Sequence, residues 1–74
     1  MVYVWNDGTS YRVVAKGPGS GITSARASES ALPYKVRRFV SQGYSLALGQ
    51  STDGKSYPLT PEVEDAIRRQ LSDA

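Results

Sequence analysis

The chain has 74 residues, of which 39% are hydrophobic and 22% are charged, with a formal net charge of +2 at pH 7. This length accommodates one small domain over residues 1–74 with a thin core, so we expect self-association, and it excludes a nucleotide-hydrolysing doubly wound sheet. The absence of Cys and His excludes disulfides, thiolate metal sites and a histidine general base. No apolar run approaches the roughly 20 residues of a membrane span and no signal-peptide pattern is present, so we expect a cytoplasmic protein without a membrane partner.

The first predicted element is a β-hairpin in residues 2–16. Two runs rich in β-branched and aromatic residues flank Asp7-Gly8, a pair typical of a two-residue turn that would place Val4 opposite Tyr11. Side chains alternate along a strand, so the hairpin has two faces. One face, predicted to be core, carries Val2, Val4, Tyr11, Val13 and Ala15. The other carries Tyr3, Trp5, Arg12, Val14 and Lys16.

Residues 17–29, GPGSGITSARASE, are rich in Gly and Ser and contain a single larger aliphatic residue, Ile22. This composition predicts a flexible loop, mobile on the nanosecond timescale.

Residues 30–43, SALPYKVRRFVSQG, are predicted to form a helix, with Ser30 as the N-cap, Pro33 in the first turn and Gly43 after the last turn. On a helix, three apolar residues cluster on one side: Val36, Phe39 and Val40. The opposite arc carries Tyr34, Lys35, Arg37, Arg38 and Ser41.

Residues 44–60 are predicted to form a second hairpin. Its core-facing side chains would be Tyr44, Leu46, Leu48, Tyr57 and Leu59. Pro58 cannot donate to a strand ladder, which places its strand at an edge of the sheet.

The loop of this hairpin, GQSTDGKS from Gly49 to Ser56, matches the phosphate-binding pattern G-x-x-x-x-G-K-[ST]. That pattern holds phosphates only where a helix begins at its Lys-Ser pair. Here Tyr57 and Thr60 both precede prolines, which disfavour helical backbone. We therefore interpret the motif as a hairpin turn with Gly54 at positive φ, and expect no nucleotide cofactor.

Residues 60–74 are predicted to form a second helix, with Thr60 as the N-cap and Pro61 at the first position. Its buried stripe would be Val63, Ala66, Ile67 and Leu71. The predicted fold class is therefore α+β: two β-hairpins forming a small antiparallel sheet with two helices packed on it, in the order ββαββα.

The charge is uneven along the chain. Residues 1–60 hold seven basic and three acidic residues, a balance of +4, whereas residues 61–74 carry −2. Basic residues interleaved with aromatic ones favour a nucleic-acid surface, because cations neutralise phosphates while rings stack on bases. The candidate binding residues are Arg12, Lys16, Lys35, Arg37, Arg38, Trp5, Tyr3 and Tyr34.

Three alternatives remain open. The cationic helix face could simply be solvated, and Trp5 and Tyr3 could be core residues covered by a helix. A protein-interaction module, such as an adaptor, inhibitor or assembly subunit, would use the same aromatic residues as anchors for a protein partner. Most carboxylates lie in turns or on the last helix, and no His activates a nucleophile, so we expect no enzymatic activity, no metal and no cofactor.

Overall fold

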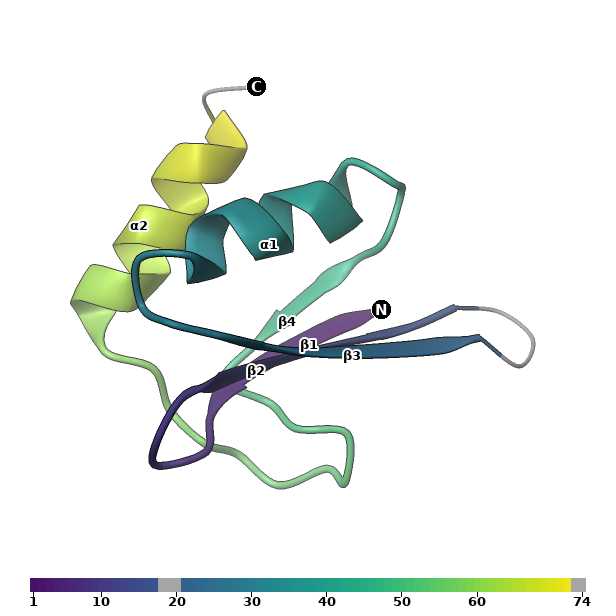
Figure 1. The fold of residues 1–74 in the computed structure, drawn as a ribbon, viewed down its shortest axis with the longest axis horizontal. Coiled ribbons are helices and arrows are strands. Elements are labelled where there is room, and N and C mark those ends of the chain that lie inside the picture. Colours follow the sequence, from purple (N-terminus) through teal and green to yellow (C-terminus); the bar gives the residue numbers. More distant parts are fainter. Residues whose placement is uncertain (18–20, 73–74) are drawn as a thin grey trace.

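The structure is a computed structural model that describes residues 1–17 and 21–72 (Figure 1). Its elements are, in chain order, β1 (Val2–Asn6), β2 (Tyr11–Lys16), β3 (Ile22–Ala27), α1 (Leu32–Val40), β4 (Leu46–Leu48) and α2 (Pro61–Ser72). The predicted α+β class is confirmed. The order of elements differs, because a third strand precedes α1 and no strand follows β4 within the described residues.

The four strands form one sheet in the order β3-β2-β1-β4. β2 pairs antiparallel with β1 and β3, whereas β4 runs parallel to β1, with Val2 beside Leu46 and Val4 beside Leu48. The prediction of an entirely antiparallel sheet is therefore wrong at β4. The additional strand β3 explains this difference. β3 runs in the same direction as β1, and the connection through α1 carries the chain back across the sheet, so β4 also runs in the direction of β1.

The turn between β1 and β2 spans four residues, 7–10, rather than the predicted two. Asp7 Oδ1 accepts hydrogen bonds from the backbone N–H groups two and three residues further on, at 3.2 and 3.0 Å, which stabilises the longer turn. Val4 therefore lies opposite Val13 and not opposite Tyr11. Because the register differs by an even number of residues, both faces keep their predicted members.

The predicted loop at residues 17–29 is wrong over Ile22–Ala27, which form β3 and pair along their whole length with β2. The prediction for residues 18–20 lies outside the described residues. Most side chains of β3 are small or exposed, so the strand is held by its backbone ladder and buries only Ala27 fully. A strand of this kind lacks the apolar alternation by which strands are recognised.

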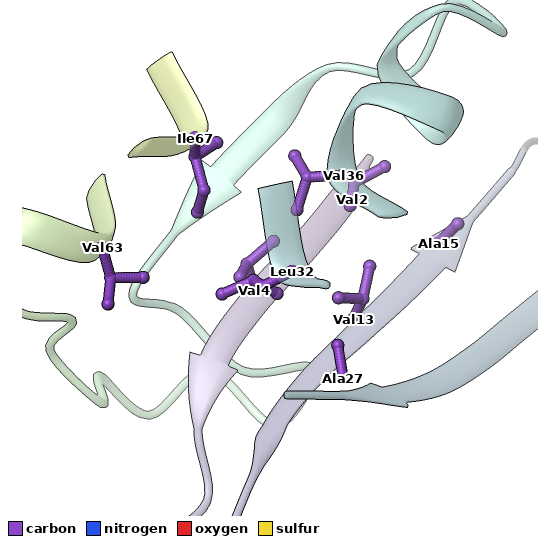
Figure 2. Close-up of a cluster of buried hydrophobic side chains, with 9 residues drawn as sticks. All are labelled: Val2, Val4, Val13, Ala15, Ala27, Leu32, Val36, Val63 and Ile67. Atoms are coloured by element: carbon purple, nitrogen blue, oxygen red, sulfur yellow. The ribbon is translucent and has the colours of Figure 1, made fainter. Parts of the chain in front are cut away.

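Both helices pack on the same side of the sheet (Figure 1). The buried core between them and the strands consists of Val2, Val4, Val13, Ala15, Ala27, Leu32, Val36, Val63 and Ile67. Figure 2 shows Leu32 and Val36 of α1 in one buried cluster with Val2 and Val4 of β1. The predicted core face of the first hairpin is thus confirmed.

The start of α1 differs from the prediction by one residue. Ala31 occupies the N-cap position, so the prediction of Ser30 is wrong, and no side chain caps this end. Instead, the Ser28 carbonyl accepts hydrogen bonds from the backbone N–H groups of Ala31 and Leu32, at 3.1 and 2.9 Å. Pro33 lies in the first turn, as predicted.

The helix α1 ends one residue earlier than predicted, because Ser41 and not Gln42 is the C-cap, but Gly43 has the backbone expected of a glycine that ends a helix. Gly43 has a φ of +100° and its N–H donates to the Val40 carbonyl at 3.0 Å. Phe39 packs partly against the core and meets Tyr44 edge to face, with ring centroids 6.2 Å apart.

The second predicted hairpin is present only as a turn. Gln50 and Ser56 form an isolated antiparallel bridge, and Gly54 has the predicted positive φ, at +84°. No second strand follows in the described residues, so the placement of Pro58 in an edge strand is wrong, and so is a core position for the exposed Tyr57. The predicted core contacts of Tyr44, Leu46, Leu48 and Leu59 are confirmed.

The C-terminal helix matches the prediction closely. Thr60 Oγ1 accepts a hydrogen bond from the Val63 backbone N–H at 3.3 Å, and Pro61 is the first helical residue. Val63 and Ile67 are fully buried on the stripe that faces α1 and the sheet. α2 is therefore anchored by its cap and by its apolar stripe.

Candidate functional site

The sheet has a second face, on the side away from both helices, which we call the open face. The cross-strand register extends it over all four strands. Its residues are Tyr3, Trp5, Arg12, Val14, Lys16, Ile22, Ser24, Arg26 and Ala47. No helix of the described chain covers this face, so Tyr3 and Trp5 are not buried beneath one (Figure 1).

Trp5 is at one end of a row that crosses three strands. It lies beside Arg12 of β2, which in turn lies beside Arg26 of β3. Neighbouring strands are about 4.8 Å apart, so side chains in one row are within reach of one another. The row therefore places Trp5, Arg12 and Arg26 at neighbouring positions on the open face.

Tyr3 is part of a second row with Val14, Ser24 and Ala47. Tyr3 and Trp5 are both half-buried, whereas Val14 of β2 is only 5% exposed. The aromatic side chains thus lie on the central strand β1, on the same face as the buried Val14 of β2. Side chains held in this way lose little conformational entropy when a ligand stacks on them.

Arg12 is fixed within the sheet. One terminal nitrogen donates to Ser24 Oγ at 2.9 Å, and its Nε is buried without a hydrogen-bond partner among the described residues. Arg26 and Lys16 are exposed at either end of the face. One arginine is therefore positioned by the protein, and two other cations can move to meet an anion.

The electrostatics of the open face are one-sided, because none of the four strands contains an acidic residue. The nearest carboxylate along the chain is Asp7, in the turn after β1. Backbone hydrogen bonds from Ser10 and Thr9 hold the pKa of Asp7 below its ordinary value, with a smaller contribution from Arg26. This carboxylate therefore stays ionised at neutral pH and offsets part of the charge of Arg26, whereas Arg12 and Lys16 have no acidic residue on the strands beside them.

The basic face of α1 is a separate surface. Tyr34 and Arg38 are exposed there, and Lys35 and Arg37 are half-buried. Because α1 packs on the core side of the sheet, these residues are separated from the open face by the core itself (Figure 1). The eight candidate residues therefore form two surfaces on opposite sides of the molecule: Tyr3, Trp5, Arg12 and Lys16 on one, and Tyr34, Lys35, Arg37 and Arg38 on the other.

Arg26 joins the open face although sequence reasoning placed it in a loop. The alternation of Ile22, Ser24 and Arg26 with the small residues between them was the only pattern that could have indicated the strand. It is weak, because Ala, Ser and Thr do not define an apolar face.

The GQSTDGKS turn is closed by its own hydrogen bonds. The Ser51 N–H donates to the Lys55 carbonyl at 3.0 Å, and the Lys55 N–H donates to Asp53 Oδ1 at 3.1 Å. Ser51 Oγ also bonds the Asp53 carboxylate. The next helix begins at Pro61, so the predicted turn is confirmed and the helix that a phosphate loop requires does not follow Lys55.

Across the described residues, no group of three or more metal-binding side chains forms a site. The described helices include none that is long and apolar enough to cross a membrane. No protein family, curated protein or solved structure matches the chain. The surfaces of the protein are therefore the basis on which its function is inferred.

Proposed function

We propose that this chain is a small non-catalytic protein that binds single-stranded nucleic acid on the open face of its sheet. The observation that carries the proposal is the row Trp5, Arg12 and Arg26, which sets a stacking surface beside two cations on strands without acidic residues. Single strands are bound by this combination, because bases stack on rings while phosphates meet basic side chains. The cytoplasmic location and self-association remain predictions.

The shape of the open face supports a single strand over a duplex. Tyr3 and Trp5 are spaced two residues apart on one strand, about 6.6 Å, and point to the same side of the sheet. Two unstacked bases can occupy such neighbouring rings, whereas the bases of a duplex are already stacked on each other. Arg26 and Lys16, at opposite ends of the face, are available to the phosphates of the same strand.

The test is a titration with short single-stranded DNA and RNA, followed by the fluorescence of Trp5, the only tryptophan of the chain. Stacking should quench the indole, and binding should weaken with salt by a log–log slope of about −0.7 per phosphate contact. Trp5→Ala should weaken binding by about 1–3 kcal/mol, measured by anisotropy of a labelled oligonucleotide, whereas Trp5→Phe should retain much of it.

Charge variants separate the two basic surfaces. Arg26→Glu and Lys16→Glu change exposed residues of the open face, and Arg37→Glu makes the same change on α1 as the matched control. We expect the first two to weaken binding and lower the salt slope, and the third to leave both unchanged. If only Arg37→Glu lost affinity for the oligonucleotide, the binding site would lie on α1 and not on the open face.

Absence of binding at about 50 mM salt, where phosphate contacts are strong, would overturn the proposal. The protein-interaction module would then be the better interpretation of Tyr3 and Trp5.

A further inference from the structure

β3 is an edge strand whose outer side has no neighbour in the sheet. Lys16 exchanges backbone hydrogen bonds with Met1, and the Gly17 N–H donates to the Gly21 carbonyl. The backbone groups of successive residues point to alternate sides of a strand. Counting from these bonds, the backbone groups of Thr23 and Ala25 point towards β2. Those of the intervening residues, Ile22, Ser24 and Arg26, therefore point outward, where a further strand could pair with them.

A groove of about 410 Å³ runs beside this edge, between β3 and α1. It is lined by Thr23, Ala25, Lys35, Arg38, Phe39 and Gln42. The groove exists because α1 packs over β1 and β2, while the small side chains of β3 leave the space above that strand unfilled.

The charge of this groove distinguishes it from three other hollows on the described surface. Lys35 and Arg38 line it and no carboxylate does. Three other hollows each include an acidic residue: Glu29 and Glu62 in one, Glu29 in the second, and Asp7 in the third. A ligand in the groove therefore meets two positive charges that no lining carboxylate offsets.

We propose that an extended acidic peptide binds in this groove by adding to β3 as a fifth strand. Its backbone would pair with the outward groups of β3, which is how many sheet edges recognise peptides. Side chains of the added strand alternate, so every second one faces Lys35 and Arg38 and is expected to be acidic. The intervening ones lie on the other side, beside Ile22, which is 63% exposed and favours an apolar neighbour.

The cations that select this peptide lie on α1 and not on the open face, so charge changes on the two surfaces can be tested separately. The intervening side chains of the peptide lie at the edge of the open face, beside Ile22. The test uses a fluorescein-labelled peptide of alternating Val and Glu with blocked termini, long enough to cover the six residues of β3. A peptide of alternating Val and Lys is the control for charge. We expect saturable anisotropy changes with the Glu peptide, weaker at high salt, and none with the Lys peptide.

Protein variants locate the site. Lys35→Glu and Arg38→Glu should each weaken the Glu peptide by about tenfold or more, because they place like charges in the groove. Arg37→Glu, which makes the same change on α1 outside the groove lining, should leave its affinity unchanged. Lys16→Glu, on the open face, should also have no effect, whereas it should weaken an oligonucleotide.

Backbone methylation tests the strand pairing. In an added strand, alternate N–H groups point towards β3, so N-methylation of one alternate set of residues should abolish binding and methylation of the other should be tolerated. Equal tolerance of both sets would contradict strand addition. The proposal would be overturned if the Glu peptide failed to bind or if the Lys peptide bound equally well. It would also be overturned if an oligonucleotide displaced the Glu peptide and the Lys35→Glu variant no longer bound that oligonucleotide.

Discussion

The Tyr11 hydroxyl donates a hydrogen bond to Glu29 Oε1 at 3.4 Å, joining the start of β2 to the connection between β3 and α1. Burial, together with the charge and hydrogen bond of Glu29, raises the pKa of Tyr11 above its ordinary value of 10.0. The folded state thus holds this proton more tightly than the unfolded state does.

The first prediction is a loss of stability in alkali. The protonated Tyr11 hydroxyl contributes to the free energy of unfolding. This contribution is fully present below about pH 10 and is lost as the pH rises through the folded-state pKa, because the unfolded chain releases the proton first. The free energy of unfolding of wild type relative to Tyr11→Phe, from urea melts, should therefore be constant below pH 10 and fall above it. Tyr34→Phe, on an exposed tyrosine, is the control. A difference that does not vary with pH would contradict the prediction.

The second prediction compares two isoleucines. Ile67 is fully buried between α2, α1 and the sheet, whereas Ile22 is 63% exposed. Ile67→Ala should lower the free energy of unfolding by about 2–5 kcal/mol through lost burial and the cavity it leaves. Ile22→Ala should change it by less than about 0.5 kcal/mol, as for most surface positions. The free energy of unfolding is measured by urea denaturation. Similar decreases in both variants would contradict the burial of Ile67 and the exposure of Ile22.

The third prediction concerns the end of α1. A Cβ at Gly43 would meet no atom, so its φ of +100° is the source of cost, and Gly43→Ala should destabilise the protein by about 1–2 kcal/mol. Gly21→Ala also meets no atom and its φ is not in the positive region, which makes it the matched control. Thermal melts should show a lower midpoint for the first variant only. An equal shift in both would remove the conformational explanation.

The fourth prediction is that the GQSTDGKS turn binds no nucleotide. The backbone N–H groups of Ser51, Gly54 and Lys55 are bonded within the turn, and Asp53 would face the phosphates with a like charge. Hydrogen bonds from Ser51 and the Lys55 backbone lower the pKa of Asp53, so its charge persists at neutral pH. Titration of ATP or GTP with magnesium should give no saturable heat in calorimetry. A saturable signal that is lost in Lys55→Ala would prove the interpretation wrong.

The sequence predicted well the elements that carry their own local pattern. The first hairpin and the C-terminal helix have clear apolar periodicity and, in the helix, a Thr60 cap followed by Pro61. Both faces of the hairpin were right even though its turn was not, because side-chain alternation survives an even shift in register.

The elements that depend on distant partners were not predictable in the same way. β3 is a strand because β2 offers it a ladder, not because Ile22–Ala27 favours one, and without β3 the direction of β4 could not be inferred. The candidate site combines residues from predictable elements with residues whose positions depend on distant partners. Trp5 and Arg12 were correctly predicted to share a face, although the predicted register put Trp5 opposite Ser10. Arg26 was missed, and the basic residues of α1 proved to lie on the other side of the core.

The position of β1 in the middle of the sheet constrains the order in which the chain can fold. β1 meets β2 across a short turn, but its other neighbour, β4, is separated from it by two strands and a helix. Local contacts close quickly and distant ones slowly, because closing a longer loop costs more chain entropy. We therefore expect the three-stranded meander of β1, β2 and β3 to form first, with Val2 and Val4 exposed until α1 and β4 arrive. During synthesis, a nascent chain that has delivered only the meander would present this uncovered apolar surface to chaperones, and a ribosome pause after β3 would lengthen that interval.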